Sequence, residues 1–209
     1  MNHCLRIVLA VSFVALFAAE LCFAQGSQSQ SREKLMEQAR QEYIAGKFAD
    51  AERDFRELVK RDPADIDAQA YLGHALFRQQ KYADAVVPYE KARELEASGS
   101  KLPSDQHRVL IDQLAMAYGI SGDLKKTYAL LESAIRDDPE YPLNYYNLAC
   151  AYAEEGDKGK SLTNLSLAFQ HKEHVLKGEQ MPDARTDSSF QKYVRDEDFT
   201  KLMTKLGYK

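Results

Sequence analysis

Apolar and small side chains recur every three or four positions along most of the chain, which is the spacing of one face of an α-helix. Leu72, Leu76 and Phe77 mark one such face, and a polar break follows at residues 80–81. A second face then runs through Tyr82, Ala85, Val86, Tyr89 and Ala92. The pattern predicts an all-α protein built from pairs of helices, with no alternating strand pattern between them.

The helix pairs repeat with a period of 34 residues. The segment 46–55 (GKFADAERDF) recurs as 80–89 (QKYADAVVPY), and 114–123 (LAMAYGISGD) recurs as 148–157 (LACAYAEEGD). A fixed period in this range indicates supersecondary units that stack on one another.

Small residues occupy matching positions in the repeats. We expect them to let paired helices approach closely, while aromatic rings fill the space beside them. They are Ala39, Gly73, Ala115 and Ala149 in the first helices, and Ala51, Ala85, Thr127 and Ser161 in the second.

The repeated residues resemble the tetratricopeptide repeat (TPR), in which a Leu-Gly pair in one helix is followed by Ala, Phe and a closing Pro in the next. Leu72-Gly73, Ala85 and Tyr89 carry the resemblance most clearly. It implies a right-handed solenoid of helical hairpins with about four units, near residues 32–65, 66–99, 108–141 and 142–174. An eight-residue insertion near 98–105 is expected to form a surface loop, with contact to a ligand as the alternative.

The last part of the chain, residues 175–209, has two short amphipathic segments. Phe190 and Tyr193 belong to the first, and Phe199, Leu202 and Met203 to the second. We expect them to cap the solenoid by covering the exposed apolar face of the fourth unit. A detachable binding segment is the alternative. This tail also resembles those of exported bacterial TPR proteins.

The N-terminal residues 1–24 have the layout of a secretory signal peptide, with Arg6 before an apolar run at 7–19 that is too short to span a membrane. We expect cleavage before Gln25, a polar tether at 25–31, and an exported protein in the periplasm or outside the cell. A lipid anchor on Cys22 and an uncleaved membrane anchor are the alternatives.

The net charge bears on binding to nucleic acid, and the cysteine count bears on disulfide bonds. With 28 Lys and Arg against 32 Asp and Glu, the net charge of −4 disfavours binding to nucleic acid. Of the three cysteines, Cys4 and Cys22 would leave with the signal peptide. The mature chain would keep only Cys150, so an internal disulfide is excluded.

Motifs for catalysis or metal binding are absent from the sequence. There is no HExxH or Gly-x-Ser-x-Gly pattern, and His171 with His174 supplies two of the three or four ligands that a metal site needs. We therefore expect no cofactor, no metal and no enzymatic activity.

The first helices of stacked hairpins line the inner face of such a solenoid. The stripe next to the packed Leu and small residues supplies the candidate partner-binding positions: Met36, Arg40, Tyr43, His74, Phe77, Arg78, Asp112, Met116, Tyr146 and Cys150. Aromatic, Met and Arg side chains are enriched at protein interfaces.

The sequence thus favours a non-catalytic scaffold that binds a protein or peptide segment on this inner face, outside the cytoplasm. One alternative is an enzyme, or an accessory subunit of one, that uses a groove between Cys150 and His74. Another is a structural protein that self-associates through an end of the stack.

Overall fold

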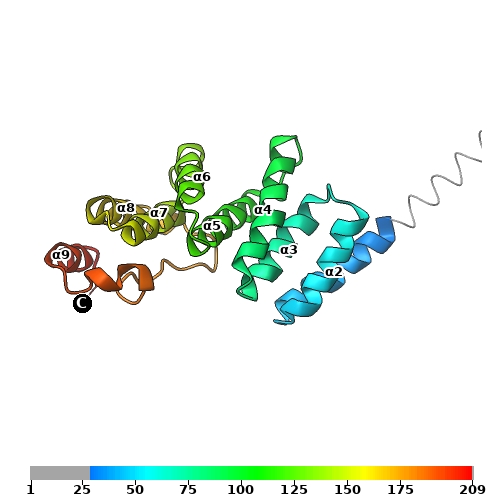
Figure 1. Ribbon diagram of the computed structural model, residues 1–209, viewed down its shortest axis with the longest axis horizontal. Coiled ribbons are helices and arrows are strands. Elements are labelled where there is room, and N and C mark those ends of the chain that lie inside the picture. The colour runs from blue at the N-terminus through cyan, green and yellow to red at the C-terminus, as the bar shows by residue number, and fades with distance from the viewer. Residues whose placement is uncertain (1–28, 209) are drawn as a thin grey trace, which may run out of the picture.

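The computed structural model describes residues 29–208, and all of the regular elements in this range are helical. The described part of the first helix spans residues 29–44 and is called the N-terminal helix below. It is followed by α2 (Phe48–Arg61), α3 (Ile66–Arg78), α4 (Tyr82–Ala97), α5 (Ser104–Ile120), α6 (Leu124–Asp137), α7 (Pro142–Glu155), α8 (Lys158–Gln170), the short 3-10 helices η1 (Lys172–His174) and η2 (Ser188–Tyr193), and α9 (Glu197–Lys205). The expected all-α fold is confirmed (Figure 1).

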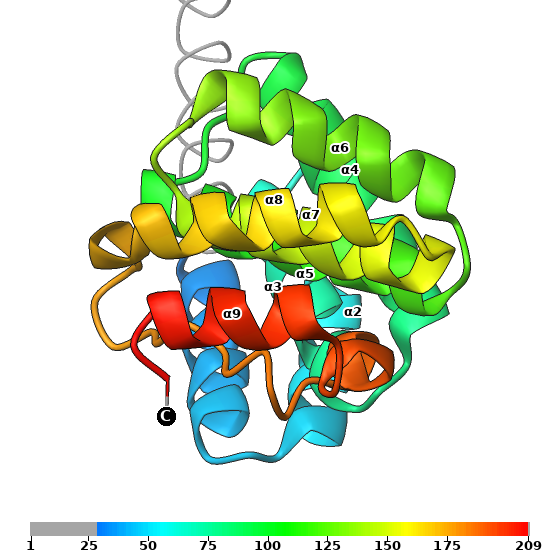
Figure 2. The same cartoon turned by 90° about the vertical axis from the view of Figure 1, so that its left-hand side faces the viewer.

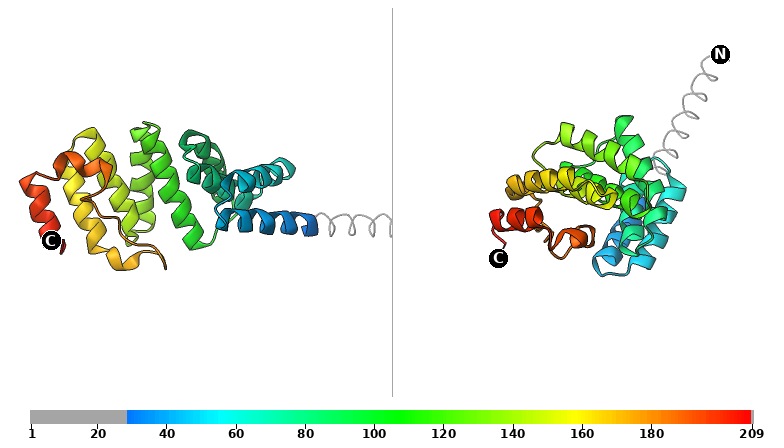
Figure 3. Two further views of the ribbon diagram at one scale, coloured as in Figure 1. Left: turned by 90° about the horizontal axis from the view of Figure 1, so that it is seen from below. Right: turned by 60° about the vertical axis from the view of Figure 1, so that its left-hand side comes forward.

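Consecutive helices form hairpins that stand side by side along the molecule (Figure 3). The N-terminal helix pairs with α2, and the further pairs are α3 with α4, α5 with α6, and α7 with α8. Each pair also packs on the next, because α2 lies against α3, α4 against α5 and α6 against α7. The result is a solenoid of helical hairpins with a core that continues from pair to pair.

The loop inside each hairpin turns at the same point of the repeat. Gly46, Gly122 and Gly156 have φ angles of 75°, 83° and 91° there, a conformation that glycine adopts readily. Gln80 holds the equivalent position in the second hairpin with a φ of 61°. A residue with a side chain loses about 1 kcal/mol or more in this left-handed region. The hairpin geometry therefore overrides the local preference of Gln80.

The close approach of α3 and α4 depends on Gly73. A Cβ atom at this position would lie 2.4 Å from Cε1 of Tyr89, whose ring is fully buried. Ala39, Ala51, Ala85, Ala115 and Ala149 are likewise completely or almost completely buried. The expected packing of small residues against bulky rings is confirmed.

Arginines at the start of two first helices bind aspartates in the turn that leads to the next hairpin. Arg32 donates to both carboxylate oxygens of Asp65, at 2.6 and 2.8 Å. Asp65 also caps α3 by accepting from the backbone N–H of Ala68. Arg108 makes the corresponding pair with Asp138, at 2.7 and 3.2 Å. These bidentate pairs fix the step from one hairpin to the next.

Two buried clusters form the core. The first extends through the first three hairpins, and the second joins α7 and α8 to the C-terminal residues. Ile135 packs against both clusters, so the apolar interior is continuous. Phe190 and Phe199 are buried in the second cluster, with ring centroids 6.1 Å apart. The apolar core therefore continues from the fourth hairpin into the C-terminal residues.

The C-terminal residues also contact earlier helices. After η1 the chain returns toward α5 and then runs back past α7 to η2, and α9 lies beside α8 (Figures 1 and 2). Residues 175–193, which include η2, are called the C-terminal strap below.

The expected signal peptide at 1–24 lies outside the described residues. Of the expected tether, residues 29–31 belong to the N-terminal helix, because neither Gly nor Pro interrupts the chain between residues 27 and 45. The loop expected near 98–105 is shorter, since α5 already begins at Ser104. Within residues 29–208, every helix is too short or too polar to cross a membrane.

Candidate protein-binding surface

The inner face is defined here as the side on which the first helices of successive hairpins meet, where α3 contacts α5 and α5 contacts α7. Repeat position places the candidate residues along this face, one set on each first helix. The structure divides the face into two parts. The C-terminal strap covers the part on α7, and no described segment covers the part on the N-terminal helix and α3.

Tyrosine hydroxyls of the fourth hairpin hold the strap. Tyr146 donates a hydrogen bond to Asp187 at 2.9 Å, and Tyr141 donates one to Glu179 at 3.1 Å. Ala184 and Phe190 of the strap are fully buried against this surface. A segment of the chain made of turns and η2 therefore already occupies the inner face of α7.

Cys150 lies under the strap on the same face of α7. Burial raises the pKa of its thiol well above the usual value, and the negative charge of Asp187 adds to this effect, while a hydrogen bond with Ser189 opposes it. The thiol is therefore protonated at neutral pH, which is unfavourable for nucleophilic chemistry.

Asp112 on α5 is the polar centre of the covered region. It accepts a hydrogen bond from the Asn147 amide at 2.5 Å. Burial raises the pKa of Asp112 to about 7; the hydrogen bond from Asn147 lowers it, and the nearby charge of Glu179 in the strap raises it. Asp112 thus links α5, α7 and the strap.

His74 belongs to a buried polar network rather than to an open surface. Its Nδ1 atom lies 2.8 Å from the Tyr89 hydroxyl and 2.9 Å from Oε1 of Gln113, and the Tyr89 hydroxyl donates to Gln113. Burial lowers the pKa of His74 to about 4, although the hydrogen bond with Gln113 works in the opposite direction. The neutral imidazole joins α3, α4 and α5.

The uncovered part of the inner face carries two arginines that stack on rings. The Arg40 guanidinium lies 4.8 Å from the ring centre of Tyr71, and that of Arg78 lies 4.6 Å from the ring centre of Phe48. Within residues 29–208 neither makes a hydrogen bond or an ion pair, and Nε of Arg40 is buried without a partner. Both cations remain available to a ligand.

Apolar groups accompany these arginines. Tyr43 is half-buried, with its ring 5.4 Å from Phe48 and 6.4 Å from Tyr71. On α5, 39% of Met116 and 56% of Ile120 are exposed. Such exposed large apolar side chains on one helix are typical of a contact surface.

The structure thus separates the ten candidate residues. Arg40, Tyr43, Phe77, Arg78 and Met116 are exposed or half-buried on the uncovered part. Met36, at 3% exposure, and His74 are core residues, because their side chains point between helices. Tyr146 is buried at 2% exposure by the strap, which also lies over Cys150 and faces Asp112. Met36, His74 and Tyr146 are therefore corrected, because the folded chain buries them, whereas Asp112 and Cys150 remain half-buried beside the strap.

Ile120 and Tyr71 also belong to this surface, although neither was among the positions predicted from the repeat pattern. Ile120 stands four residues after Met116, so helical spacing alone could have identified it. Tyr71 is recognisable only from its contact with Arg40, which involves two different hairpins.

The expected groove between His74 and Cys150 does not assemble a catalytic pair. His74 is bound to Tyr89 and Gln113, whereas Cys150 faces Asp187 and Ser189. Across residues 29–208, no group of three or more His, Cys, Asp or Glu side chains is arranged to hold a metal ion.

Comparison with known proteins identifies the repeats. Residues 36–99 match the family described as tetratricopeptide repeat. No curated protein matches the chain by sequence. Among solved structures, a crystal structure of MamA protein superposes with a TM-score of 0.64 at 20% identity, over 83% of this chain and 91% of that one.

Two further solved structures are similar. MamA from Desulfovibrio magneticus gives a TM-score of 0.62 at 18% identity, covering 84% of this chain and 92% of that one. YrrB, described as a TPR protein with an unusual peptide-binding site, gives 0.58 at 14% identity, covering 82% of each chain. At these identities the likeness establishes the fold alone.

Proposed function

We propose that this chain, whose residues 36–99 match the tetratricopeptide repeat and whose fold resembles solved TPR proteins, is a non-catalytic scaffold that binds a segment of another protein on the uncovered part of its inner face. Proteins of this family generally act as protein-interaction scaffolds. The proposed site comprises Arg40, Tyr43, Phe77, Arg78, Met116 and Ile120.

The occupied half of the same face is the observation that carries this proposal. The strap lies on α7 as a chain of turns that ends in η2, with carboxylates on tyrosine hydroxyls and with Ala184 buried. This supports the view that the face can accept a polypeptide segment. YrrB, which shares the fold, is described as having a peptide-binding site, and this is consistent with the proposal.

The exposed side chains indicate the chemistry of the partner. Met116 and Ile120 offer apolar contact area, and the stacked guanidinium groups of Arg40 and Arg78 lack carboxylate partners among the described residues. A segment with apolar side chains and at least one carboxylate fits this surface. Since the rings of Tyr71 and Phe48 already hold the arginines in place, little side-chain entropy is lost on binding.

We place this activity outside the cytoplasm. The support is the expected signal peptide at 1–24. N-terminal sequencing of the protein from its native host would test this part separately, and a mature chain beginning at Gln25 is the expected result. A chain that keeps residues 1–24 and stays in the cytoplasm would contradict it.

Site-specific photo-crosslinking tests the binding surface. A photo-reactive amino acid at position 116 on the inner face should give a crosslinked partner in cells, whereas position 87 is the matched control. Val87 lies on α4, a second helix of the solenoid, and is 69% exposed. Combining Arg40→Gln with Arg78→Gln should reduce the crosslink at position 116, and Lys60→Gln with Lys125→Gln should not.

Two outcomes would overturn the proposal. Equal crosslinking at positions 87 and 116 would remove the inner face as the specific surface. Products that contain only two copies of this chain would favour the self-associating alternative. The third alternative, an enzyme using Cys150 and His74, gains no support from the raised pKa of the thiol or the buried imidazole.

A further inference from the structure

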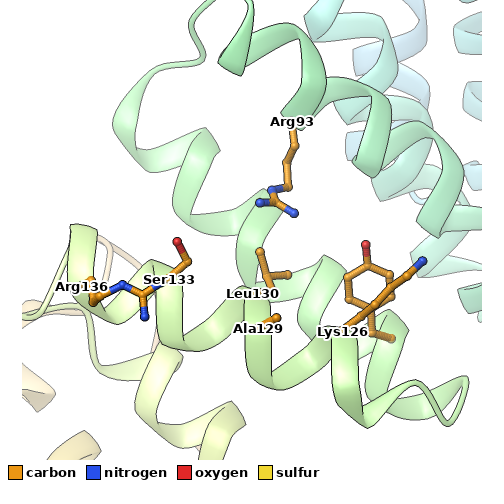
Figure 4. Close-up of a pocket in the computed structure, with 7 residues that line it drawn as sticks. Arg93, Lys126, Ala129, Leu130, Ser133 and Arg136 are labelled. Atoms are coloured by element: carbon orange, nitrogen blue, oxygen red, sulfur yellow. The ribbon is translucent and has the colours of Figure 1, made fainter.

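A second groove lies between α4 and α6, away from the inner face and the strap (Figure 4). It has a volume of about 280 Å³. Arg93 reaches into it from α4, while Lys126, Ser133 and Arg136 line it from α6. The apolar part of the lining comes from Tyr118, Ala129 and Leu130.

Two cations of this groove make neither a hydrogen bond nor an ion pair within the described residues. Arg93 and Arg136 make no hydrogen bond or ion pair within residues 29–208, and the Ser133 hydroxyl makes none there either. Lys126 differs, because it donates to Glu90 at 3.0 Å and lies 4.0 Å from Asp123. Glu90 also accepts from the Tyr118 hydroxyl. These carboxylates neutralise Lys126, and Glu90 also interacts electrostatically with Arg93, but no carboxylate within residues 29–208 makes an ion pair with either arginine.

The two arginines lie at different points of the groove. Arg136 is six residues after Leu130 on α6, which corresponds to about 9 Å along a helix. In Figure 4, Arg93 points toward Leu130. A single small anion would meet one arginine at a time, whereas an extended chain of about three residues would reach from one to the other.

We propose that this groove is a second docking surface, which binds an acidic segment of a partner protein along α6. Carboxylates of the segment would bind Arg93 and Arg136, and its stem atoms would lie on Leu130 and Ala129. The charge complementarity is local, because the chain as a whole has a net charge of −4. This surface goes beyond the proposed inner-face site and shares none of its residues.

Fluorescence anisotropy with a labelled hexaglutamate peptide tests the proposal on the intact protein. We expect saturable binding that weakens when salt rises from about 0.05 to about 0.3 M. Arg93→Gln combined with Arg136→Gln should weaken it by at least about tenfold, the change expected when two charge-assisted contacts are lost. The control pair Lys60→Gln with Lys125→Gln removes the same charge outside the groove and should change affinity by less than about twofold.

Further probes separate this proposal from other anion sites. Labelled hexaglutamine should not bind. If inorganic phosphate displaces hexaglutamate at equal concentration, or if single-stranded DNA or anionic lipid vesicles bind with the same dependence on Arg93 and Arg136, the site is a general anion site and the proposal fails. Equal weakening by both variant pairs would also overturn it. Loss of binding through Arg40→Gln with Arg78→Gln instead would assign the acidic segment to the inner face.

Discussion

The hydroxyl of Tyr146 on α7 donates a hydrogen bond to Asp187, 41 residues further along the chain, at 2.9 Å. Asp187 also accepts from the backbone N–H of Ser189 at the start of η2. One carboxylate therefore anchors the C-terminal strap to the inner face and begins the helix that follows. The relationship explains why half of this face is unavailable to a partner.

Tyr146→Phe should loosen the strap. The variant leaves Asp187 with one partner fewer, and hydrogen bonds to charged groups contribute about 1.5–3 kcal/mol. We expect faster alkylation of Cys150, because the strap lies over this thiol. The rate measured by mass spectrometry checks this. Tyr145→Phe is the matched control, since the Tyr145 hydroxyl donates to the Pro139 carbonyl oxygen and not to the strap; equal acceleration in both variants would contradict the anchoring role.

Gly73→Ala should destabilise the fold, because its Cβ would lie 2.4 Å from the buried Tyr89 ring. Overpacking of this kind costs about 1–3 kcal/mol. Gly119→Ala is the control, since its nearest contact would be 3.8 Å, to Oγ1 of Thr127. In the last turn of α5 it should have little effect on stability or stabilise by less than the roughly 0.5–1 kcal/mol expected in a helix interior. Urea unfolding measures both, and equal effects would refute the close approach of α3 and α4.

Gln80→Gly should stabilise the protein by about 1 kcal/mol, because the φ of 61° at this position favours glycine. The opposite change at the equivalent turn, Gly156→Ala, should destabilise by a similar amount, since its φ is 91°. Thermal unfolding followed by circular dichroism measures both shifts. A lower melting temperature for Gln80→Gly would contradict the shared turn geometry.

His74 should make stability fall in mild acid. Its pKa is lowered by burial from 6.5 to about 4, so between these values the unfolded chain binds the additional proton. Stability from the neutral imidazole is complete above pH 6.5 and is lost as the pH falls toward 4. As the pH falls over this range, the unfolding free energy of the wild type should therefore decrease relative to that of His74→Gln. A difference that is constant with pH would contradict the neutral buried state.

Asp112 should make stability fall as the pH rises, which is the opposite of the effect of His74. Its pKa is raised by burial from 3.8 to about 7, so the folded protein binds the additional proton between these values. Stability from the protonated carboxyl is lost as the pH rises from about 4 to 7. Asp112→Asn, which keeps an acceptor for Asn147, should gain stability relative to wild type across this range. Denaturant titrations at several pH values measure the trend, and a reversed slope would refute the assignment.

Local and periodic signals along the chain were enough to predict the helices and their pairing. Spacings of three and four residues specify helical faces, and the 34-residue period places small residues such as Gly73 opposite rings such as Tyr89. These signals are local or strictly periodic, so they can be read without coordinates. The five candidates on the uncovered part of the inner face, including Arg40 and Met116, follow from the same spacing.

Which part of that face is accessible could not be predicted from the repeats, because it depends on the folded path of the chain. Met36 and His74 share the repeat register of their exposed neighbours, but the packing between hairpins buries them. The strap covers Tyr146 and Cys150 because the chain turns back after η1, and contacts such as Tyr146 with Asp187 join residues with no periodic relationship. Which side chain meets which across such distances depends on the path of the folded chain, and hydrophobic spacing carries no information about that path.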